Sequence, residues 1–495
     1  MALMIRFHNT LGGVLEDFRP LRPGEVGLYT CGPTVYDFPH IGNWRAYVFE
    51  DLLKRFLMFT GLRVTHVLNL TDIDDKTIRD SKARTVEELK RYTEKYIAAY
   101  MAERDLLNIL PADHYPRATD HVPEMVALIR TLLEKGFAYE KDGSVYFAID
   151  RFPAYGRLSK VSLDGRRPGS RGDADEYAKE SVHDFALWKA AKEGEPFWDT
   201  EVGRGRPGWH IECSAMSKKY LGPTFDIHCG GVDNIFPHHE NEIAQSEAAN
   251  GVKFVDYWLH CHHLVVDGEK MSKSKGNFYV LGDILARGYD PREVRFLLLS
   301  THYRKMLNFT FEALDQARAG RNRIRDFLVD LRGVKGEGPP GRKAADLIAT
   351  ARAGFVAGLE DDLNISEALA ALFTLIERAN GMMAKGELTR AAAQALREFV
   401  EDIDDRILKI EPTSVIVGPG PQSLKGEAIP PAVKVDVSGE IDEVMQKLID
   451  ERQRARAAKD YKRADEIREQ LLAQGILLED TKDGVRLKRV PPSGV

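Results

Sequence analysis

The sequence predicts an α/β chain built on a doubly wound parallel sheet with an inserted subdomain, followed by an α-helical bundle and a small C-terminal domain. Three observations predict it: a strand–helix–strand pattern near the N-terminus, a strand that resumes near residue 224, and helical periodicity from about 310 to 410. The chain has 495 residues, more than one hydrophobic core usually serves, so several domains are expected.

The first strand–helix–strand unit spans residues 26 to 70. Apolar residues alternate over 26–30 and predict a strand, and Asn43 is the expected cap of the helix that follows. A second strand is expected over 63–70. Because the strands of a right-handed unit are parallel and ligands gather beyond their C-terminal ends, Cys31 and Thr71 are predicted to lie at a binding site.

The rest of the chain supplies the insertion, the bundle and the tail. The expected elements are a hairpin over 137–149, an irregular loop over 156–174, a strand over 224–228, a helix that opens at Pro237, a bundle over 310–410, a linker over 412–437, a helical hairpin over 439–474 and a strand-like tail that ends at Arg489.

Composition and charge exclude several classes of protein. Hydrophobic residues make up 43% of the chain and charged residues 29%, as in ordinary globular proteins, and the net charge of −6 excludes a chain coated in positive charge. We find neither a secretory leader nor an apolar run of membrane-spanning length, so no membrane association is expected. Four cysteines are too few for a disulfide framework, and a cytoplasmic location is predicted.

A scattered set of soft and imidazole ligands predicts a metal site. His238 and Glu242 are four residues apart on an expected helix and so share one face. Cys213 and Cys31 would complete a set of two thiolates, one imidazole and one carboxylate, which suits zinc. Composition alone leaves the choice open, because the other two cysteines, at 229 and 261, are rival ligands and no paired-cysteine motif anchors the site.

Two short stretches predict a phosphate site. His40, Gly42 and Asn43 lie between the first strand and its helix, where backbone amides favour an anion. Lys270 and Lys273 are three residues apart in a loop after a strand-like run, and such a pair can clamp a polyphosphate. Each stretch is a weak signal by itself, since lysine and serine loops are usually solvated surface.

The two stretches and four longer ones resemble a known family. HIGN at 40–43 and KMSKS at 270–274 resemble the signature motifs of class I aminoacyl-tRNA synthetases. The resemblance to cysteinyl-tRNA synthetases covers essentially the whole chain and rests on YTCGPTVYDFPHIGN (29–43), NLTDIDDK (69–76), GRPGWHIECSAMS (205–217) and FDIHCGGVDNIFPHHENEIAQ (225–245).

The resemblance implies a role for each matching position. It implies one zinc ion per chain held by Cys31, Cys213, His238 and Glu242, and a cysteine subsite made by Cys31, Gly32, Thr71 and Trp209. It implies ATP contacts, with magnesium bound to the ATP, from His40, Gly42, Asn43, His228, Gly230, Gly231, Asp233, Lys270 and Lys273. Of these, His40, Asn43, Lys270 and Lys273 would stabilise the transferring phosphate and are the expected catalytic residues.

The resemblance also implies a division into domains and a set of partners. The expected division is a Rossmann catalytic domain in two halves (1–115 and 205–265), a connective-peptide insertion (116–204), a stem-contact region with the KMSKS loop (266–309), a helical bundle (310–411), a linker (412–437) and an anticodon-binding domain (438–495). The implied activity is that of a cysteine–tRNA ligase, which forms cysteinyl-adenylate and transfers cysteine to the terminal adenosine of tRNA(Cys). The partners are then L-cysteine, ATP and tRNA(Cys), and the chain is expected to be a monomer.

Three positions depart from the family pattern. Asn43 stands where a second histidine is frequent, Cys229 replaces a common glycine, and Leu487 stands where a tryptophan is expected in the tail. Asparagine can donate a hydrogen bond to phosphate but has no charge to offer.

Two other readings of the sequence remain open. A cysteine ligase of mycothiol biosynthesis resembles the catalytic half but lacks the tail at 439–495. A non-catalytic tRNA-binding paralogue would usually lose a signature lysine or a metal ligand, and this chain keeps Lys270, Lys273 and all four implied ligands.

Overall fold

The computed structural model describes residues 4–161, 184–411, 467, 476–481 and 484–489. The described residues up to 411 form one compact unit, and the strands near the C-terminus belong to a second unit. No helix in these described segments combines the length and the hydrophobicity needed to cross a bilayer.

A four-stranded parallel sheet lies at the centre of the first unit, in the order β11-β10-β3-β4. Its strands are β3 (Glu25–Thr30), β4 (Arg63–Leu68), β10 (Phe225–Gly231) and β11 (Val255–Cys261). The strands expected at 26–30, 63–70 and 224–228 are therefore confirmed, as is the parallel pairing of the first two.

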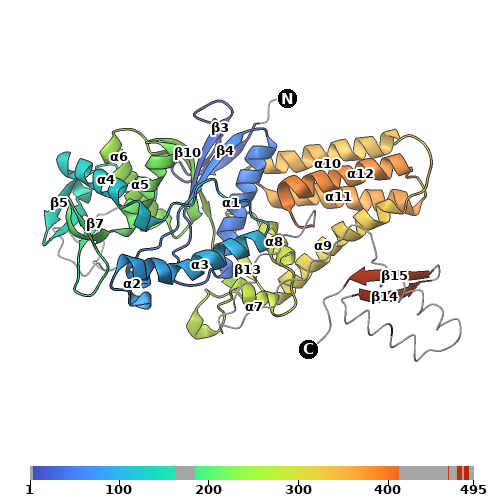
Figure 1. The fold of residues 1–495 in the computed structure, drawn as a ribbon. Coiled ribbons are helices and arrows are strands. Elements are labelled where there is room, and N and C mark those ends of the chain that lie inside the picture. Colours follow the sequence, from blue (N-terminus) through green and yellow to red (C-terminus); the bar gives the residue numbers. More distant parts are fainter. Residues whose placement is uncertain (1–3, 162–183, 412–466, 468–475, 482–483, 490–495) are drawn as a thin grey trace. The chain divides into compact units, whose positions relative to one another are not determined.

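Both faces of this sheet are buried, as expected of a doubly wound fold. Leu28 packs into a core with α1 (Ile41–Phe59), whereas its neighbour Tyr29 packs into a second core with α5 (Trp209–Leu221) and α6 (Glu240–Asn250). Figure 1 shows α1 on one side of the sheet and α5 and α6 on the other. Successive side chains along each strand therefore pack into two separate cores, one on each face of the sheet.

Helix α1 begins with a capping box whose N-cap residue differs from the one expected. His40, not Asn43, is the N-cap: its imidazole accepts a hydrogen bond from the Asn43 backbone N–H, and the Asn43 side chain accepts one from the His40 N–H. The expected cap was wrong because Ile41 and Gly42 are already helical, which makes Asn43 the third helical residue. The helix ends at Thr60, just before Gly61, as expected.

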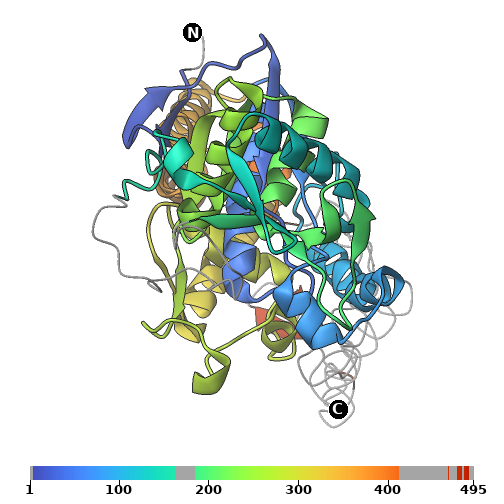
Figure 2. The same ribbon diagram turned by 90° about the vertical axis from the view of Figure 1, so that its left-hand side faces the viewer.

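An inserted sheet separates β4 from β10 in the sequence, and Figure 2 shows it facing the viewer. Its strands are antiparallel, in the order β5-β6-β7-β9-β8, and comprise β5 (Ala138–Lys141), β6 (Ser144–Phe147), β7 (Phe185–Ala190), β8 (Trp198–Thr200) and β9 (Gly203–Pro207). The hairpin expected over 137–149 is confirmed, with Asp142 and Gly143 at its turn, both with positive φ. The loop expected over 156–174 lies mostly outside the described residues.

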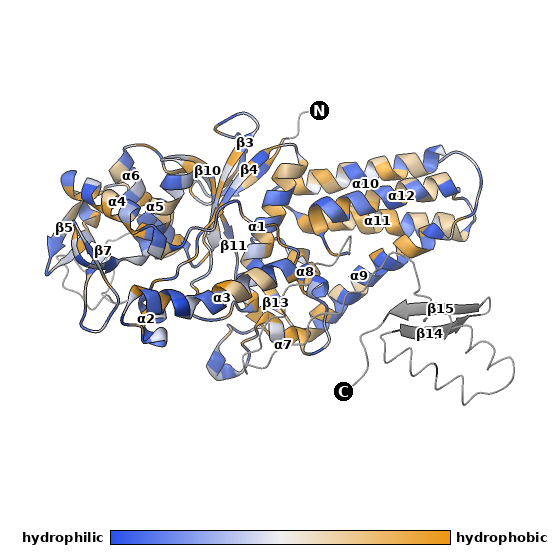
Figure 3. Cartoon of the chain, in the orientation of Figure 1, coloured by the Kyte–Doolittle hydropathy of each residue, from blue (hydrophilic) through white to orange (hydrophobic). Residues whose placement is uncertain are grey.

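Helices fill the segment from 311 to 403, which confirms the helical expectation there. They are α9 (Phe311–Arg332), α10 (Arg342–Glu360), α11 (Ile365–Ala384) and α12 (Arg390–Ile403). Figure 3 shows hydrophobic and hydrophilic stripes along them, and their apolar residues join the core that includes α1.

Shorter elements complete the described chain. They are β1 (Arg6–Asn9), β2 (Val14–Asp17), α2 (Asp75–Ser81), α3 (Val86–Leu106), α4 (Val122–Glu134), β12 (Leu264–Val266), α7 (Leu281–Leu285), α8 (Pro291–Ser300) and β13 (Leu307–Phe309). In the second unit β14 (Ile476–Thr481) pairs antiparallel with β15 (Gly484–Arg489), which confirms a strand-forming tail. The linker at 412–437 and, apart from residue 467, the helical hairpin at 439–474 lie outside the described residues.

Candidate active site

A pocket of about 1150 Å³ opens beyond the C-terminal ends of the parallel strands. Its lining includes Cys31 after β3, Thr71 after β4, and Gly230 and Gly231 at the end of β10. All the site residues expected from the sequence line this pocket except His228 and Glu242, which lie fully buried. Residues of both signature stretches and three of the four candidate metal ligands therefore line one cavity.

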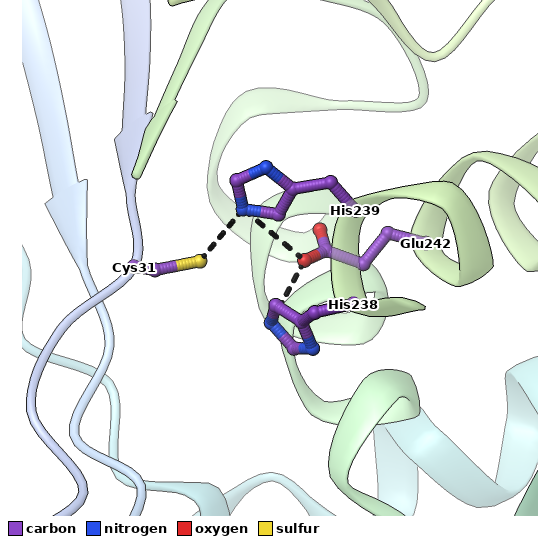
Figure 4. A group of neighbouring side chains, drawn as sticks. All are labelled: Cys31, His238, His239 and Glu242. Atoms are coloured by element: carbon purple, nitrogen blue, oxygen red, sulfur yellow. Dashed lines mark hydrogen bonds and ion pairs between the residues drawn. The ribbon is translucent and has the colours of Figure 1, made fainter. Parts of the chain in front are cut away.

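The candidate metal ligands converge at one end of this pocket. Ligand atoms of Cys31, His238, His239 and Glu242 all lie within 4.8 Å of one another (Figure 4). Cys213, on α5, is 1% exposed, and its Sγ lies 3.5 Å from Nε2 of His238. The structure thus brings together the four predicted ligands, which come from three separate parts of the chain, and adds His239.

The local backbone around His238 differs from the expected helix. Residues Ile235–His239 form a π-helical turn in which Phe236 is extended (φ −141°, ψ 130°), and α6 begins only at Glu240. Because Phe236 is the non-helical residue of this turn, the helical path opens at Pro237 as expected, first as a π-helical turn and then, from Glu240, as α6. His238 and Glu242 nevertheless meet, with Nε2 and Oε1 3.0 Å apart.

His239 is the residue that the sequence reasoning missed. Its Nε2 lies 3.2 Å from Sγ of Cys31, and its Nδ1 lies 2.8 Å from Nε2 of His260. Burial is the main cause that holds the pKa of His239 well below its usual range. The adjacent His238–His239 pair was a signal in the sequence, but spacing could not show that both rings face inward.

Opposite charges are concentrated at this end of the pocket. A hydrogen bond with Cys31 lowers the pKa of Cys213 to about 6, against the effect of burial. Burial alone would lower the pKa of His238, but the Glu242 carboxylate and Cys213 outweigh it and raise that pKa to about 10. Burial would likewise raise the pKa of Glu242, but His228 and His238 lower it to about 2. Cys213 and Glu242 therefore place negative charge beside a position that favours a cation.

The other two cysteines lie elsewhere. Cys229, in β10, and Cys261, in β11, are buried, and neither belongs to the converging group found among the described residues. Burial raises the pKa of Cys261 to about 12 and that of Cys229 well above its usual range. Position, not protonation, separates these two thiols from the candidate ligands, because burial raises the pKa of Cys31 as well.

The walls beside the metal group are shaped by close packing. A side chain on Gly32 would collide with the backbone oxygen of Asn69, since its Cβ would lie 1.7 Å from that atom. The Asn69 side chain accepts a hydrogen bond from the Gly32 N–H and donates one to Oγ1 of Thr71. The Trp209 ring stacks on His238 with centroids 4.2 Å apart, so the pocket has an aromatic wall next to the candidate ligands.

The phosphate end of the pocket is made by the two signature stretches. The His40 ring packs edge-on against Phe278, and the Lys273 ammonium lies 5.2 Å from the centre of the same ring. Lys273 also forms an ion pair with Asp37. A Cβ on Gly42 would lie 2.8 Å from Cε of Met271, so the two stretches are in close contact. Burial lowers the pKa of His40, which keeps this imidazole neutral near pH 7.

Comparisons with known proteins agree with this arrangement. A family model described as the tRNA synthetases class I (C) catalytic domain matches residues 17–319, a DALR domain model matches 354–406, and a cysteinyl-tRNA ligase anticodon binding domain model matches 438–486. The chain is 45% identical to the cysteine–tRNA ligase of Solibacter usitatus, over 98% of this chain and 100% of that protein. It is also 45% identical to the cysteine–tRNA ligase of Chlamydia muridarum, over 98% of this chain and 99% of that one.

Solved structures extend the likeness in fold. A Mycobacterium tuberculosis methionyl-tRNA synthetase in complex with methionyl-adenylate superimposes with a TM-score of 0.59 at 18% identity, over 78% of this chain and 92% of that one. A putative arginyl-tRNA synthetase from Campylobacter jejuni gives a TM-score of 0.53 at 12% identity, over 79% and 93% of the two chains. At such low identity these two likenesses concern the fold alone.

Proposed function

The chain belongs to the cysteine–tRNA ligases, a family of class I aminoacyl-tRNA synthetases, and we propose how its own residues perform the family's reaction. Its partners are ATP, an amino acid and tRNA. The proposal concerns the metal, the residues that hold each substrate and the specificity for L-cysteine and tRNA(Cys). One observation supports it above all: two thiols, an imidazole and a carboxylate converge at the end of the pocket that both signature stretches line.

The donor set fits a zinc ion. Cys31, Cys213, His238 and Glu242 would hold it, and the raised pKa of His238 shows that their surroundings favour a positive charge. Oε1 of Glu242 is buried, accepts no hydrogen bond and lies 3.0 Å from Nε2 of His238, so both atoms could bind one cation. When bound, zinc would supply a soft Lewis acid that accepts a thiolate and discriminates against the hydroxyl of serine.

The remaining cysteine contacts would orient the amino acid. The Gly32 backbone packs closely against that of Asn69, Thr71 is fixed by Asn69, and Trp209 forms the wall beside His238. A hydrophobic pocket alone separates near-isosteres by roughly 100-fold, so the soft ligand set has to supply most of the selectivity over serine.

Adenylation needs no protein nucleophile. ATP would enter with its magnesium, with adenosine at Gly230, Gly231 and Asp233 and with His228 beneath the pocket floor. The cysteine carboxylate attacks the α-phosphorus, the bond from that phosphorus to the bridging oxygen breaks, and pyrophosphate leaves. His40, Asn43, Lys270 and Lys273 would hold the triphosphate and stabilise the charge that develops on it.

The second step transfers the acyl group. A ribose hydroxyl of the terminal adenosine attacks the adenylate carbonyl, loses its proton, and AMP departs. The match of residues 438–486 to an anticodon binding domain supports tRNA, rather than an amino sugar, as the acceptor. We further propose that the enzyme acts as a monomer. We also propose a cytoplasmic location, because four cysteines without a disulfide suit a reducing compartment.

Two assays test this proposal. The purified protein should catalyse ATP–pyrophosphate exchange that depends on cysteine and not on serine, and it should contain one zinc per chain. Deletion of residues 439–495 should impair tRNA charging far more than exchange. Equal loss of both activities would contradict the assignment of that segment to tRNA.

A further inference from the structure

An aromatic surface joins the mouth of the pocket to the outer side of α3. It consists of four aromatic residues with two lysines over them, and we call it the aromatic–lysine ledge. Its members are Tyr36, Phe38, Lys76, Tyr92, Lys95 and Tyr96.

Direct contacts hold the ledge together. The Tyr92 hydroxyl donates a hydrogen bond to the backbone oxygen of Tyr36, at 3.2 Å, and lies 3.4 Å from the Tyr96 hydroxyl. The Phe38 and Tyr96 rings pack edge-on with centroids 5.2 Å apart. These aromatic contacts join the loop that lines the pocket to α3, and Tyr36 and Tyr92 are half-buried rather than sealed in the core.

The two lysines of the ledge contact aromatic rings. Lys95 Nζ lies 4.5 Å from the centre of the Tyr96 ring and 5.0 Å from that of Tyr92, and Lys76 Nζ lies 5.8 Å from that of Tyr36. Neither ammonium forms an ion pair with a carboxylate of the described segments. Nearby Lys90, in contrast, is paired with Asp120. The ledge therefore presents two ammonium groups that contact no carboxylate of the described segments, beside half-buried rings, and Asp80 is an acidic group within electrostatic range of Lys76.

The position of the ledge suits the tRNA, which is the acceptor of the second step. Tyr36, Phe38 and Lys76 line the rim of the pocket, and the ledge leads outward from there along α3. None of its residues belongs to the proposed cysteine, ATP or metal contacts. Lysines that meet phosphates, set among rings on which bases stack, are the chemistry of single-stranded nucleic acid binding.

We propose that the aromatic–lysine ledge binds the single-stranded 3′ end of the tRNA and leads it into the pocket. Lys76 and Lys95 contact backbone phosphates, and the rings of Tyr36 and Tyr92 offer stacking surfaces to the bases. This inference rests on the proposed function, because it concerns only the acceptor of the second step.

Binding measurements on the full chain test the ledge. The Lys76→Ala/Lys95→Ala double variant is compared with wild type for binding intact tRNA(Cys) and the same tRNA without its unpaired 3′ nucleotides, over a range of salt concentrations. Affinity for intact tRNA should fall about tenfold at low salt, as expected for two lost phosphate contacts. The slope of log K against log salt should decrease by about 1.4, since each phosphate contact on a single strand contributes about 0.7. Affinity for the truncated tRNA should stay as in wild type.

The matched control removes two lysines that have acidic partners. Lys219 is paired with Glu124 and lies 5.8 Å from the Tyr220 ring centre, and Lys253 is paired with Asp256. The Lys219→Ala/Lys253→Ala variant has the same change in net charge, and its affinity for intact tRNA should fall less than twofold or so.

Exchange of ATP and pyrophosphate, measured without tRNA, separates the ledge from the proposed function. The ledge variant should retain wild-type exchange with cysteine, whereas failure of wild type to show such exchange would count against the proposed function itself. The ledge assignment is overturned if the variant binds intact tRNA as wild type does, if it loses affinity for intact and truncated tRNA equally, or if exchange falls with tRNA binding.

Discussion

The two ends of the pocket are built in opposite ways. At the metal end, Cys213, His238 and Glu242 are at most 1% exposed and contact one another. At the phosphate end, the Lys273 side chain is 62% exposed and its described contacts are the Asp37 carboxylate and the Phe278 ring. The buried end has to distinguish the sulfur of cysteine from the oxygen of serine, which requires ligands in fixed positions. The exposed end has to stabilise negative charge that shifts position as pyrophosphate leaves, which a mobile lysine can do.

The largest expected effect comes from a change at the buried end. In the Cys213→Ser variant, a hydroxyl replaces a soft ligand, so kcat/KM for cysteine activation should fall on the order of 10⁴-fold. Pyrophosphate exchange and the metal content of the purified variant measure this. The matched control is Cys229→Ser, which changes another buried thiol outside the ligand group and should retain the metal.

A change at the exposed end should spare the metal. The Lys273→Ala variant should lose about 10²–10³-fold in kcat for exchange, because charge stabilisation in the transition state is removed. Its metal content and its preference for cysteine over serine should match wild type. Lys275→Ala is the control, since Lys275 is paired with Glu269 on the surface, and it should change kcat only slightly. Loss of metal in Lys273→Ala would show that the two ends are not independent.

A buried carboxyl between α1 and α3 should make the free energy of unfolding depend on pH. Trp44 donates a hydrogen bond to buried Glu103, and burial raises the pKa of this carboxyl to about 8. The folded protein therefore keeps a proton that the unfolded chain releases above about pH 4.3, so this group makes the free energy of unfolding decrease as pH rises towards 8.

Replacement of that carboxyl isolates its contribution. The Glu103→Gln variant keeps a hydrogen-bond acceptor for Trp44 without an ionisable group. Between pH 5 and pH 8, its Tm should decline less steeply than that of wild type, which thermal unfolding at matched ionic strength measures. Parallel pH profiles for the two proteins would contradict the raised pKa.

The smallest expected effect concerns the ion pair at the exposed end. Asp37 and ATP would compete for Lys273, so Asp37→Asn should lower KM for ATP by a few-fold at most, the scale of an exposed ion pair of about 1 kcal/mol or less. The kcat should stay near the wild-type value. A rise in KM would mean that Asp37 assists ATP binding rather than competing with it.

The sequence predicted local structure better than it predicted convergence. Alternation over 26–30 and the apolar pattern of the next helix sufficed for the β3–α1–β4 unit, because such patterns report burial directly. The ligand set could not be chosen by spacing, since Cys31 and Glu242 meet only through the pairing of β3 with β10 and the packing of α6. His239 escaped notice because adjacent residues of a helix point in directions about 100° apart, so spacing alone does not place both His238 and His239 in one site.

The central claim is that the sulfur of the incoming cysteine binds the metal held by Cys31, Cys213, His238 and Glu242. X-ray absorption at the zinc edge of the zinc-loaded protein tests it most directly, with spectra recorded alone, with cysteine and with serine. The account predicts one additional zinc–sulfur contact with cysteine and an unchanged sulfur count with serine. A spectrum that cysteine leaves unaltered, at a concentration that saturates exchange, would contradict it.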